Sequence, residues 1–394
     1  MGSELDGLQV FGETAVGWCA STPVNESADV EGKPVLSTSS FNASDPHAPM
    51  RRVHDDPQVC ALCEHLRAHN GIRNLEIVAP HEIERAARIF FRDGFVVVRD
   101  LLDAAQLARF RDGSARVLKD ILAIPGEGSR KYVTETGRLP HRYSYGTASA
   151  SRQLLHDPVW ASMLALPTTT PILERIFGSQ DYAVLGAGGD LCLPGAIEYQ
   201  ALHADVHERF DLPPERLAQA RTMGLARTCV DGSTEPDARS RQLIVERTPA
   251  LVTINFLMPD LTHESGPIRQ IPATQGRADP PPAQSDEPEW MRLSTLVGAK
   301  AGAGVIRDNR AWHGATPNVS REIRAKPNVE YGAPWLLPSS YRRTLPHALW
   351  LTLSPQAQHL ARHVKTDPGV WPEGAGVMHP LAAERQKAKA QAPE

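Results

Sequence analysis

The spacing of apolar residues changes along the chain and predicts which elements form. Between His81 and Arg92 apolar residues recur every three or four positions, which is typical of an amphipathic helix. The next segment, Gly94–Leu102 (GFVVVRDLL), is dense in β-branched residues and predicts a buried strand. Asp103 then stands where an N-cap is expected, so we predict a second helix that runs from there through Val117.

From about residue 180 onward, short apolar runs are separated by turn residues and predict a series of strands. The predicted strands are Tyr182–Leu185, Ile197–Val206, Ala250–Leu257, Pro267–Ile271, Gly302–Asp308 and Glu322–Ala333. No helical pattern alternates with these runs, which argues against a parallel α/β sheet. We therefore expect a mainly β fold with flanking helices, built as a barrel or a two-sheet jelly roll.

The domain organisation follows from shifts in composition. Residues 1–75 are rich in Ser, Pro, Asn, Asp and Gly, and predict an irregular N-terminal arm. Residues 76–370 are predicted to form one β domain, which residues 207–249 interrupt as a long insertion. Residues 371–394 are predicted to form a C-terminal tail. The insertion holds seven Arg and seven acidic residues, so its charge does not favour a phosphate site; it fits a lid or a solvated loop.

Composition and charge narrow the class of protein. The 394 residues are 41% hydrophobic with a net charge of -4, so no bulk attraction to nucleic acid or anionic membranes is expected. The sequence contains no run of about 18 apolar residues, so no membrane span is expected. Five cysteines and the lack of a signal-like start favour a reduced, cytoplasmic location. The pattern leaves the oligomeric state open.

The candidate chemistry begins with His203-Ala-Asp205. On a strand these two side chains point to the same face, and with a second imidazole they would form the two-histidine, one-carboxylate arrangement of oxygen-activating iron(II). Alone, the triplet fits a surface histidine beside a solvated aspartate better than a metal site, because such triplets arise often by chance. Downstream, however, a glycine turn, an apolar strand, His313-Gly, Asn318 and Arg324 follow in order.

These residues resemble the phytanoyl-CoA dioxygenase family of iron(II)/2-oxoglutarate oxygenases. Arg324 stands eleven residues after His313, as in that family. Residues 264–272 (ESGPIRQIP) are similar to the family's Gly-Pro-Leu-Arg-x-Ile-Pro segment, and residues 91–102 are similar to its opening strand. The resemblance covers roughly residues 80–340.

The resemblance implies a double-stranded β-helix, a cupin-like jelly roll, that uses Fe(II), 2-oxoglutarate and O2. It implies that His203, Asp205 and His313 are the metal ligands and that Arg324 binds the distal carboxylate of 2-oxoglutarate. A guanidinium suits this role because its planar fork matches a carboxylate. Relatives that halogenate lack the carboxylate ligand, so Asp205 favours hydroxylation or another C–H oxidation of a small-molecule substrate.

Other co-substrate contacts are open. Arg321 competes with Arg324, although the two should face opposite sides of a regular strand. Gln200, Thr253 and Asn255 are candidate polar partners of 2-oxoglutarate, and each fits a solvent-facing sheet residue as well. Ala204 and Ala315 differ from residues that several family members carry near the cofactor.

Alternative readings remain. His207 extends the first motif to His-x-Asp-x-His, which fits a zinc site, although the active-site rim is favoured. Cys60-x-x-Cys63 with nearby His65 and His69 has zinc-ligand chemistry, but the spacing favours a structural helix or loop. A non-catalytic cupin-like protein that binds metal and 2-oxoglutarate for regulation, and a zinc hydrolase or isomerase, are the competing classes.

Overall fold

The computed structural model places most of the predicted β domain. It describes residues 52–68, 75–122, 141–145, 154–197, 199–200, 202–206, 221, 227–228, 230–231, 234–235, 249–277, 279–282, 295–336, 341–370 and 372. Most of the 207–249 insertion, including His207, lies outside the described residues, as do residues 1–51 of the arm.

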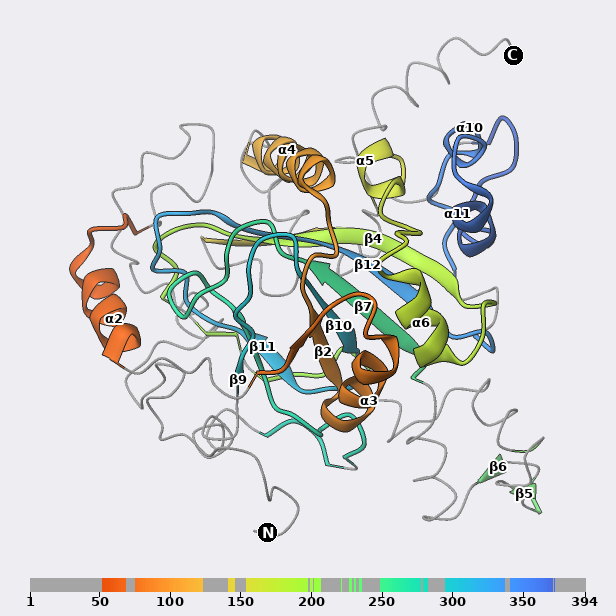
Figure 1. Cartoon of the computed structure of the whole chain (residues 1–394), viewed down its shortest axis with the longest axis horizontal. Helices are drawn as coiled ribbons and strands as arrows, with labels where there is room; N and C mark the ends of the chain where they lie inside the picture. The colour runs from red at the N-terminus through yellow and green to blue at the C-terminus, as the bar shows by residue number, and fades with distance from the viewer. Residues whose placement is uncertain are drawn as a thin grey trace.

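A seven-stranded sheet forms the larger half of the fold (Figure 1). In spatial order its strands are β1 (Ile77–Val78), β2 (Phe95–Val98), β10 (Gly304–Asp308), β7 (Leu251–Phe256), β12 (Arg324–Gly332), β4 (Ala183–Cys192) and β3 (Arg142–Tyr145). All neighbouring strands are antiparallel except β1 and β2, which are parallel. Strands distant in sequence therefore lie side by side, as in a jelly roll.

A second sheet of three strands carries the distal histidine. Its order is β11 (His313–Ala315), β8 (Ile268–Gln270) and β9 (Thr295–Leu296). A separate pair, β5 (Arg227–Thr228) and β6 (Thr234–Glu235), lies within the 207–249 insertion. The two main sheets confirm the prediction of a mainly β, double-stranded β-helix with flanking helices.

Helices flank the large sheet. They are α2 (Pro57–Ala68), α3 (Ile83–Asp93), α4 (Ala104–Leu122), α5 (Pro158–Ala161), α6 (Thr170–Phe177), α10 (His347–Trp350) and α11 (Pro355–Leu360). Helix α3 packs against β2 and α6, and α4 packs against β12 (Figure 1).

The helix boundaries follow from local chemistry. Asp103 caps α4, because its Oδ1 accepts from the backbone N–H of Gln106 (2.8 Å), while Gln106 Oε1 accepts from the N–H of Asp103 (3.0 Å). Helix α3 ends at Gly94, which adopts φ +82° and donates its N–H to the carbonyl of Phe90. The two helices predicted from the sequence are therefore confirmed, within two residues at the start of the first.

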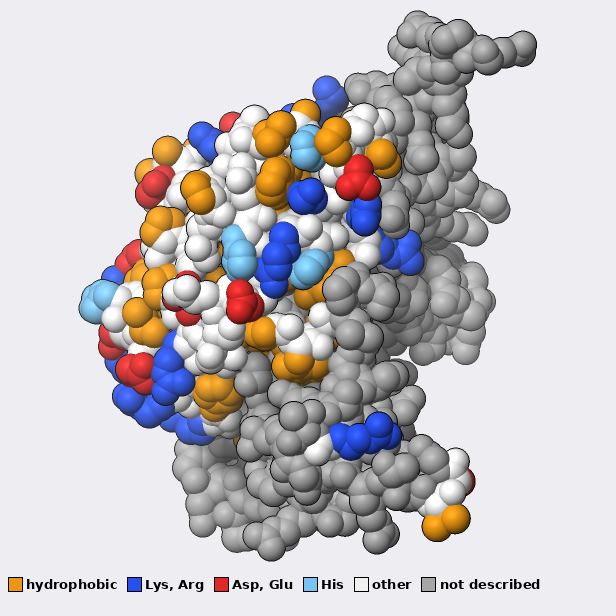
Figure 2. All heavy atoms as spheres, turned by 90° about the vertical axis from the view of Figure 1, so that its right-hand side faces the viewer, with side chains coloured by type: hydrophobic (Ala, Val, Ile, Leu, Met, Phe, Trp, Pro, Cys, Tyr) orange, Lys and Arg blue, Asp and Glu red, His pale blue; other side chains and the backbone are white. Residues whose placement is uncertain are grey.

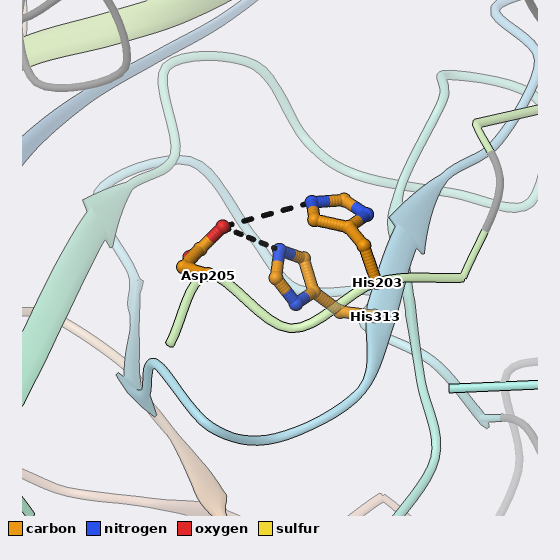
Figure 3. Close-up of side chains that lie close together, drawn as sticks. All are labelled: His203, Asp205 and His313. Carbon is orange, nitrogen blue, oxygen red and sulfur yellow. Dashed lines mark ion pairs between the residues drawn. The ribbon is translucent and has the colours of Figure 1, made fainter. Parts of the chain in front are cut away.

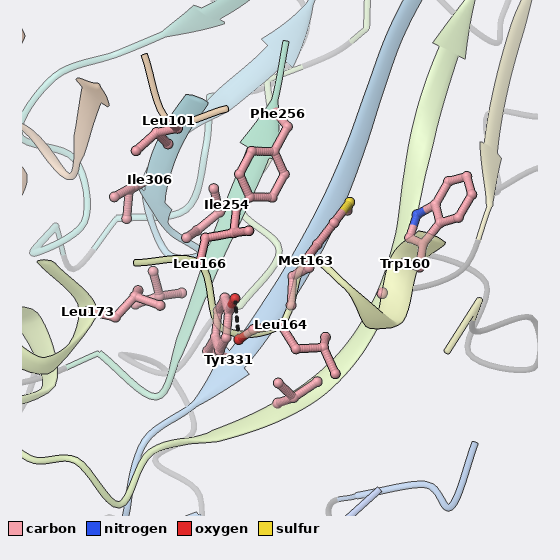
Figure 4. Close-up of a cluster of buried hydrophobic side chains, with 14 of the residues drawn as sticks. Leu101, Trp160, Met163, Leu164, Leu166, Leu173, Ile254, Phe256, Ile306 and Tyr331 are labelled. Atoms are coloured by element: carbon pink, nitrogen blue, oxygen red, sulfur yellow. Dashed lines mark hydrogen bonds between the residues drawn. The ribbon is translucent and has the colours of Figure 1, made fainter. Parts of the chain in front are cut away.

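The two faces of the large sheet differ in polarity around β7 and β12. One face is apolar and packs against the helices, with Ile254, Phe256 and Ile306 beside Leu164 and Leu173 (Figure 4). Successive residues of a strand point to opposite faces. On β12 this alternation places Arg324, Lys326, Asn328 and Glu330 together on the inner face, away from the apolar cluster.

Most predicted strands are confirmed, and one is wrong. The segment 197–206 forms no continuous strand among its described residues; Ala196 and His203 take part only in isolated bridges, to Asn318 and His313. The strand predicted at Tyr182–Leu185 is longer than predicted, because β4 continues to Cys192, which is buried.

No described helix combines the length and apolar character that crossing a bilayer requires. Figure 2 shows the face that carries α10 and α11, where acidic and basic side chains are interspersed. Pairs such as Arg343 with Asp367 (2.6 Å) and His359 with Asp181 (3.3 Å) account for part of this mixture. The described part of this face therefore carries no large field of one sign.

Candidate metal centre

The two histidines are brought together by their backbones. The N–H of His203 donates to the carbonyl of His313 (3.0 Å), and the N–H of His313 donates to the carbonyl of His203 (2.9 Å). In such a reciprocal antiparallel pair both side chains lie on the same side. The imidazole rings accordingly lie with their centroids 4.2 Å apart. A regular strand was expected to direct His203 toward the site. The bridge between β11 and an irregular segment directs it there instead.

Asp205 completes the group. Its backbone N–H donates to the carbonyl of Asn309 (2.9 Å), which anchors the bend after His203. Its Oδ1 lies 3.6 Å from Nε2 of His203 and 3.8 Å from Nε2 of His313 (Figure 3). These ligand atoms all lie within 4.8 Å of one another, and no other group of three such residues was found among the described residues.

The donor set fits an octahedral metal ion. Two ligands about 2.1 Å from a metal and at right angles are about 3 Å apart, so small side-chain shifts bring the three atoms to bonding distance. The side chains of His203 and Asp205 are 33% and 34% exposed, whereas that of His313 is 9% exposed. One side of the group is therefore open to a small molecule.

The protonation states also suit metal binding. Burial alone would raise the pKa of Asp205, but its neighbours, the Arg307 guanidinium foremost, outweigh burial and hold this pKa well below its usual value. Burial, assisted by Arg307, lowers the pKa of His313 well below its ordinary range. Asp205 is therefore ionised and His313 neutral at neutral pH, which are the forms that coordinate metals.

Arg307 on β10 lies against this group. Its Nη1 donates to Oδ2 of Asp205 (2.7 Å) and also lies 3.1 Å from Nδ1 of His313. Nδ1 lies 3.0 Å from the carbonyl of Ala311 as well. When Nδ1 of His313 carries its proton and donates it to the carbonyl of Ala311, it cannot also accept from Arg307. The Arg307 contact is then not a hydrogen bond. In this tautomer Nε2 of His313 has a free lone pair for a metal.

Arg324, the predicted clamp for 2-oxoglutarate, lies at the start of β12 and is fully buried. Its Nη1 donates to the carbonyl of Gly266 (2.8 Å), and its Nη2 pairs with Asp190 (2.9 Å). Gly266 adopts φ +69°, so the Gly-Pro segment forms a turn that suits glycine. Arg321 is exposed and outside the strand, unlike Arg324.

The other predicted co-substrate contacts are dispersed around this interior. Gln200 Oε1 accepts from the N–H of Ala315 (3.3 Å) and from Arg142 (3.3 Å). Thr253 is buried and donates to Oδ1 of Asn309 (2.8 Å), while Asn255 is buried on the same face of β7. Nδ2 of Asn255 has no hydrogen-bond partner among the residues that the structure describes.

Four charged residues of the interior were missed by the sequence argument: Asp190, Arg307, Lys326 and Glu330. Lys326 lies 3.4 Å from Asp190, and Glu330 accepts a hydrogen bond from Asn309 (2.8 Å). The signal for two of them was available, because Lys326 and Glu330 share the period-two face of Arg324. Nothing local in the sequence indicates Asp190 or Arg307.

The cysteine segment forms helix α2, as the structural alternative predicted. Cys63 is buried beside Val59 and Leu66, and Cys60 is exposed. His69 lies outside the described residues.

The fold and the donor set define a class of protein, the 2-oxoglutarate-dependent non-haem iron enzymes, which use iron and 2-oxoglutarate on a double-stranded β-helix. Within that class, the family model described as phytanoyl-CoA dioxygenase matches residues 90–325, more than half of the chain. The chain belongs to this family.

Relatives in sequence and structure are distant. Two uncharacterized proteins, from Mycobacterium bovis and Mycobacterium tuberculosis, are each 23% identical over 238 residues, which cover 60% of this chain and 71% of theirs. The 2-oxoglutarate-dependent epimerase SnoN from nogalamycin biosynthesis has a TM-score of 0.45 at 18% identity, covering 64% of this chain and 82% of SnoN.

EctD from S. alaskensis, solved with 2-oxoglutarate and 5-hydroxyectoine, has a TM-score of 0.45 at 16% identity, covering 76% of this chain and 90% of EctD. Likeness at this level carries no argument about the substrate of this chain.

Proposed function

We propose that the protein oxidises a C–H bond of a small-molecule substrate, by hydroxylation in the first instance, and couples this to decarboxylation of 2-oxoglutarate to succinate. The observation that carries the proposal is the convergence of His203, Asp205 and His313, with Oδ1 of Asp205 within 3.8 Å of both imidazole nitrogens. The three residues serve as the metal ligands.

Retention of the carboxylate favours hydroxylation over halogenation. A halide ion needs a coordination position that a small residue in place of the aspartate would leave open. Here Asp205 is ionised and directed at both histidines, so that position is taken. Bound iron(II) and 2-oxoglutarate, on reaction with O2, supply the oxidant, and the products are oxidised substrate, succinate and CO2.

Arg324 is the proposed partner of the distal carboxylate of 2-oxoglutarate, with Gln200, Thr253 and Asn255 as further polar contacts. In this proposal the co-substrate carboxylate competes with Asp190 for the Arg324 guanidinium, because Asp190 holds Nη2. Asp190 keeps another nitrogen donor nearby when Arg324 turns to the co-substrate, since Nζ of Lys326 lies 3.4 Å away. The exchange therefore leaves no carboxylate without a partner.

The test uses Asp205→Ala, with Asp181→Ala as the control. Asp181 is 72% exposed and pairs with His359 away from the donor group. Wild type and control, mixed anaerobically with iron(II) and 2-oxoglutarate, are expected to develop a visible metal-to-ligand charge-transfer band. The Asp205→Ala protein is expected to remain folded by circular dichroism and to need more iron(II) to develop the band, because it has lost one of its three ligands. A wild-type protein without the band would overturn the proposal.

Admission of O2 separates an enzyme from a regulatory protein. With a library of small metabolites present, substrate-dependent succinate release is expected from the wild type and not from Asp205→Ala. A band without succinate release across the library would favour the alternative, a non-catalytic protein that binds metal and 2-oxoglutarate.

A further inference from the structure

Arg307 is a buried arginine inside the large sheet. It lies in the middle of the large sheet, on β10, paired across the backbone with Thr253 of β7 and Phe95 of β2. Its side chain is 8% exposed, although a guanidinium remains charged when buried. Burial of a charge is costly unless the charge is paired, so the group that pairs with Arg307 indicates the role of this residue.

The partner is the oxygen of Asp205 that does not face the histidines. Nη1 of Arg307 lies 2.7 Å from Oδ2, whereas Oδ1 is the atom that approaches both imidazole Nε2 atoms. The two oxygens of one carboxylate are thus assigned different tasks. Rotation of the carboxylate that brought Oδ2 toward a metal would break a short, charge-assisted hydrogen bond.

The surroundings hold this arrangement in place. The carbonyl of Asn309 accepts from the backbone N–H of Asp205 (2.9 Å), so main chain and side chain of the aspartate are both fixed by the end of β10. The side chain of Asn309 is itself held between Thr253 (2.8 Å) and Glu330 (2.8 Å). Nε of Arg307 has no hydrogen-bond partner among the described residues, so Asp205 is its main anchor there.

We propose that Arg307 is a positioning residue that restricts Asp205 to binding the metal through Oδ1 alone. A carboxylate that binds through both oxygens fills one more coordination position, and the reaction needs three positions for 2-oxoglutarate and O2. The positive charge beside Oδ2 also raises the attraction of the site for the dianionic co-substrate. This inference rests on the proposed function.

The test compares Arg307→Met, Arg307→Gln and Arg307→Lys with the wild type. Arg111→Met is the control, because Arg111 also donates to an oxygen, the carbonyl of Met258 (2.7 Å), on the α4 side of the fold. Each protein is titrated anaerobically with iron(II), and the charge-transfer band is recorded with 2-oxoglutarate. The ratio of oxidised product to succinate is then measured with O2.

The neutral variants are expected to bind iron(II) about 10- to 100-fold more weakly, as for other residues that orient a metal ligand. Their charge-transfer band should be displaced, because the donor atoms around the metal change. Succinate release should exceed product formation. Arg307→Lys should restore most of the iron affinity, since an ammonium can still donate to Oδ2. Met and Gln are independent tests, so one folded neutral variant suffices.

A folded neutral variant with wild-type iron affinity, band and coupling would overturn the role of Arg307 while leaving the proposed function intact. Failure of the wild type itself to form the band would instead overturn the proposed function. Equal losses in Arg111→Met and Arg307→Met would mean that any lost arginine contact disturbs the site, and would also count against the proposal.

Discussion

Lys326 offers a quantitative test of how the interior of the large sheet tolerates charge. Burial, together with the neighbouring Arg324, lowers the pKa of this lysine from 10.5 to about 7, although Asp190 acts in the opposite direction. Its side chain is 5% exposed. The surroundings as a whole therefore disfavour the charged lysine even with a carboxylate 3.4 Å away.

The pKa shift sets the size of the effect. Because the pKa falls from 10.5 to about 7, a charged Lys326 lowers the free energy of unfolding by roughly 5 kcal/mol at pH 6. At pH 9 Lys326 is neutral in the folded state but still charged in the unfolded chain. Releasing its proton on folding then lowers the free energy of unfolding by about 2 kcal/mol. Between the two pKa values the unfolded chain binds more protons, so this residue makes stability rise with pH.

The perturbation is Lys326→Met, which replaces the lysine by an apolar side chain of similar length. We expect the variant to be more stable than the wild type, with a gain about 3 kcal/mol larger at pH 6 than at pH 9. Asp190 keeps Arg324 as its partner (2.9 Å), so the substitution leaves no isolated carboxylate.

The assay is urea unfolding of the metal-free protein at both pH values, followed by far-UV circular dichroism. Lys300→Met is the control, because Lys300 also pairs with an aspartate, Asp260, but is 87% exposed. This control should change stability little and equally at the two pH values. A Lys326→Met protein less stable than wild type at pH 6, or a gain independent of pH, would refute the reasoning.

Two further predictions concern single hydrogen-bonded groups. Arg324→Gln should raise the KM for 2-oxoglutarate by about 10- to 100-fold, because a charged hydrogen bond contributes about 1.5–3 kcal/mol; steady-state succinate assays test this, and an unchanged KM would exclude Arg324 as the clamp. Asp103→Ala should lower the free energy of unfolding by about 1 kcal/mol through loss of the α4 cap. Chemical denaturation measures this loss, and Asp112→Ala, at an exposed position within α4, should not lower the free energy of unfolding.

Local patterns determined the elements that depend only on neighbours in the chain. The capping box of Asp103, the positive φ of Gly94 and the β-branched run of β2 are each set by residues within a few positions. The spacing from His313 to Arg324 and the Gly-Pro segment also lay in the linear sequence. These signals were enough to predict the fold class and the candidate metal ligands.

Tertiary structure decided how the side chains meet. The described residues around His203 form no continuous strand, and a backbone bridge to His313, 110 residues away, aligns the imidazoles instead. Arg307 meets Asp205 across 102 residues, and Arg324 meets Asp190 across 134. No short-range pattern encodes such pairs, because each depends on which strands become neighbours. The sequence by itself therefore determined the elements and the chemistry available, whereas the long-range pairing of strands decided which charge lies beside which ligand.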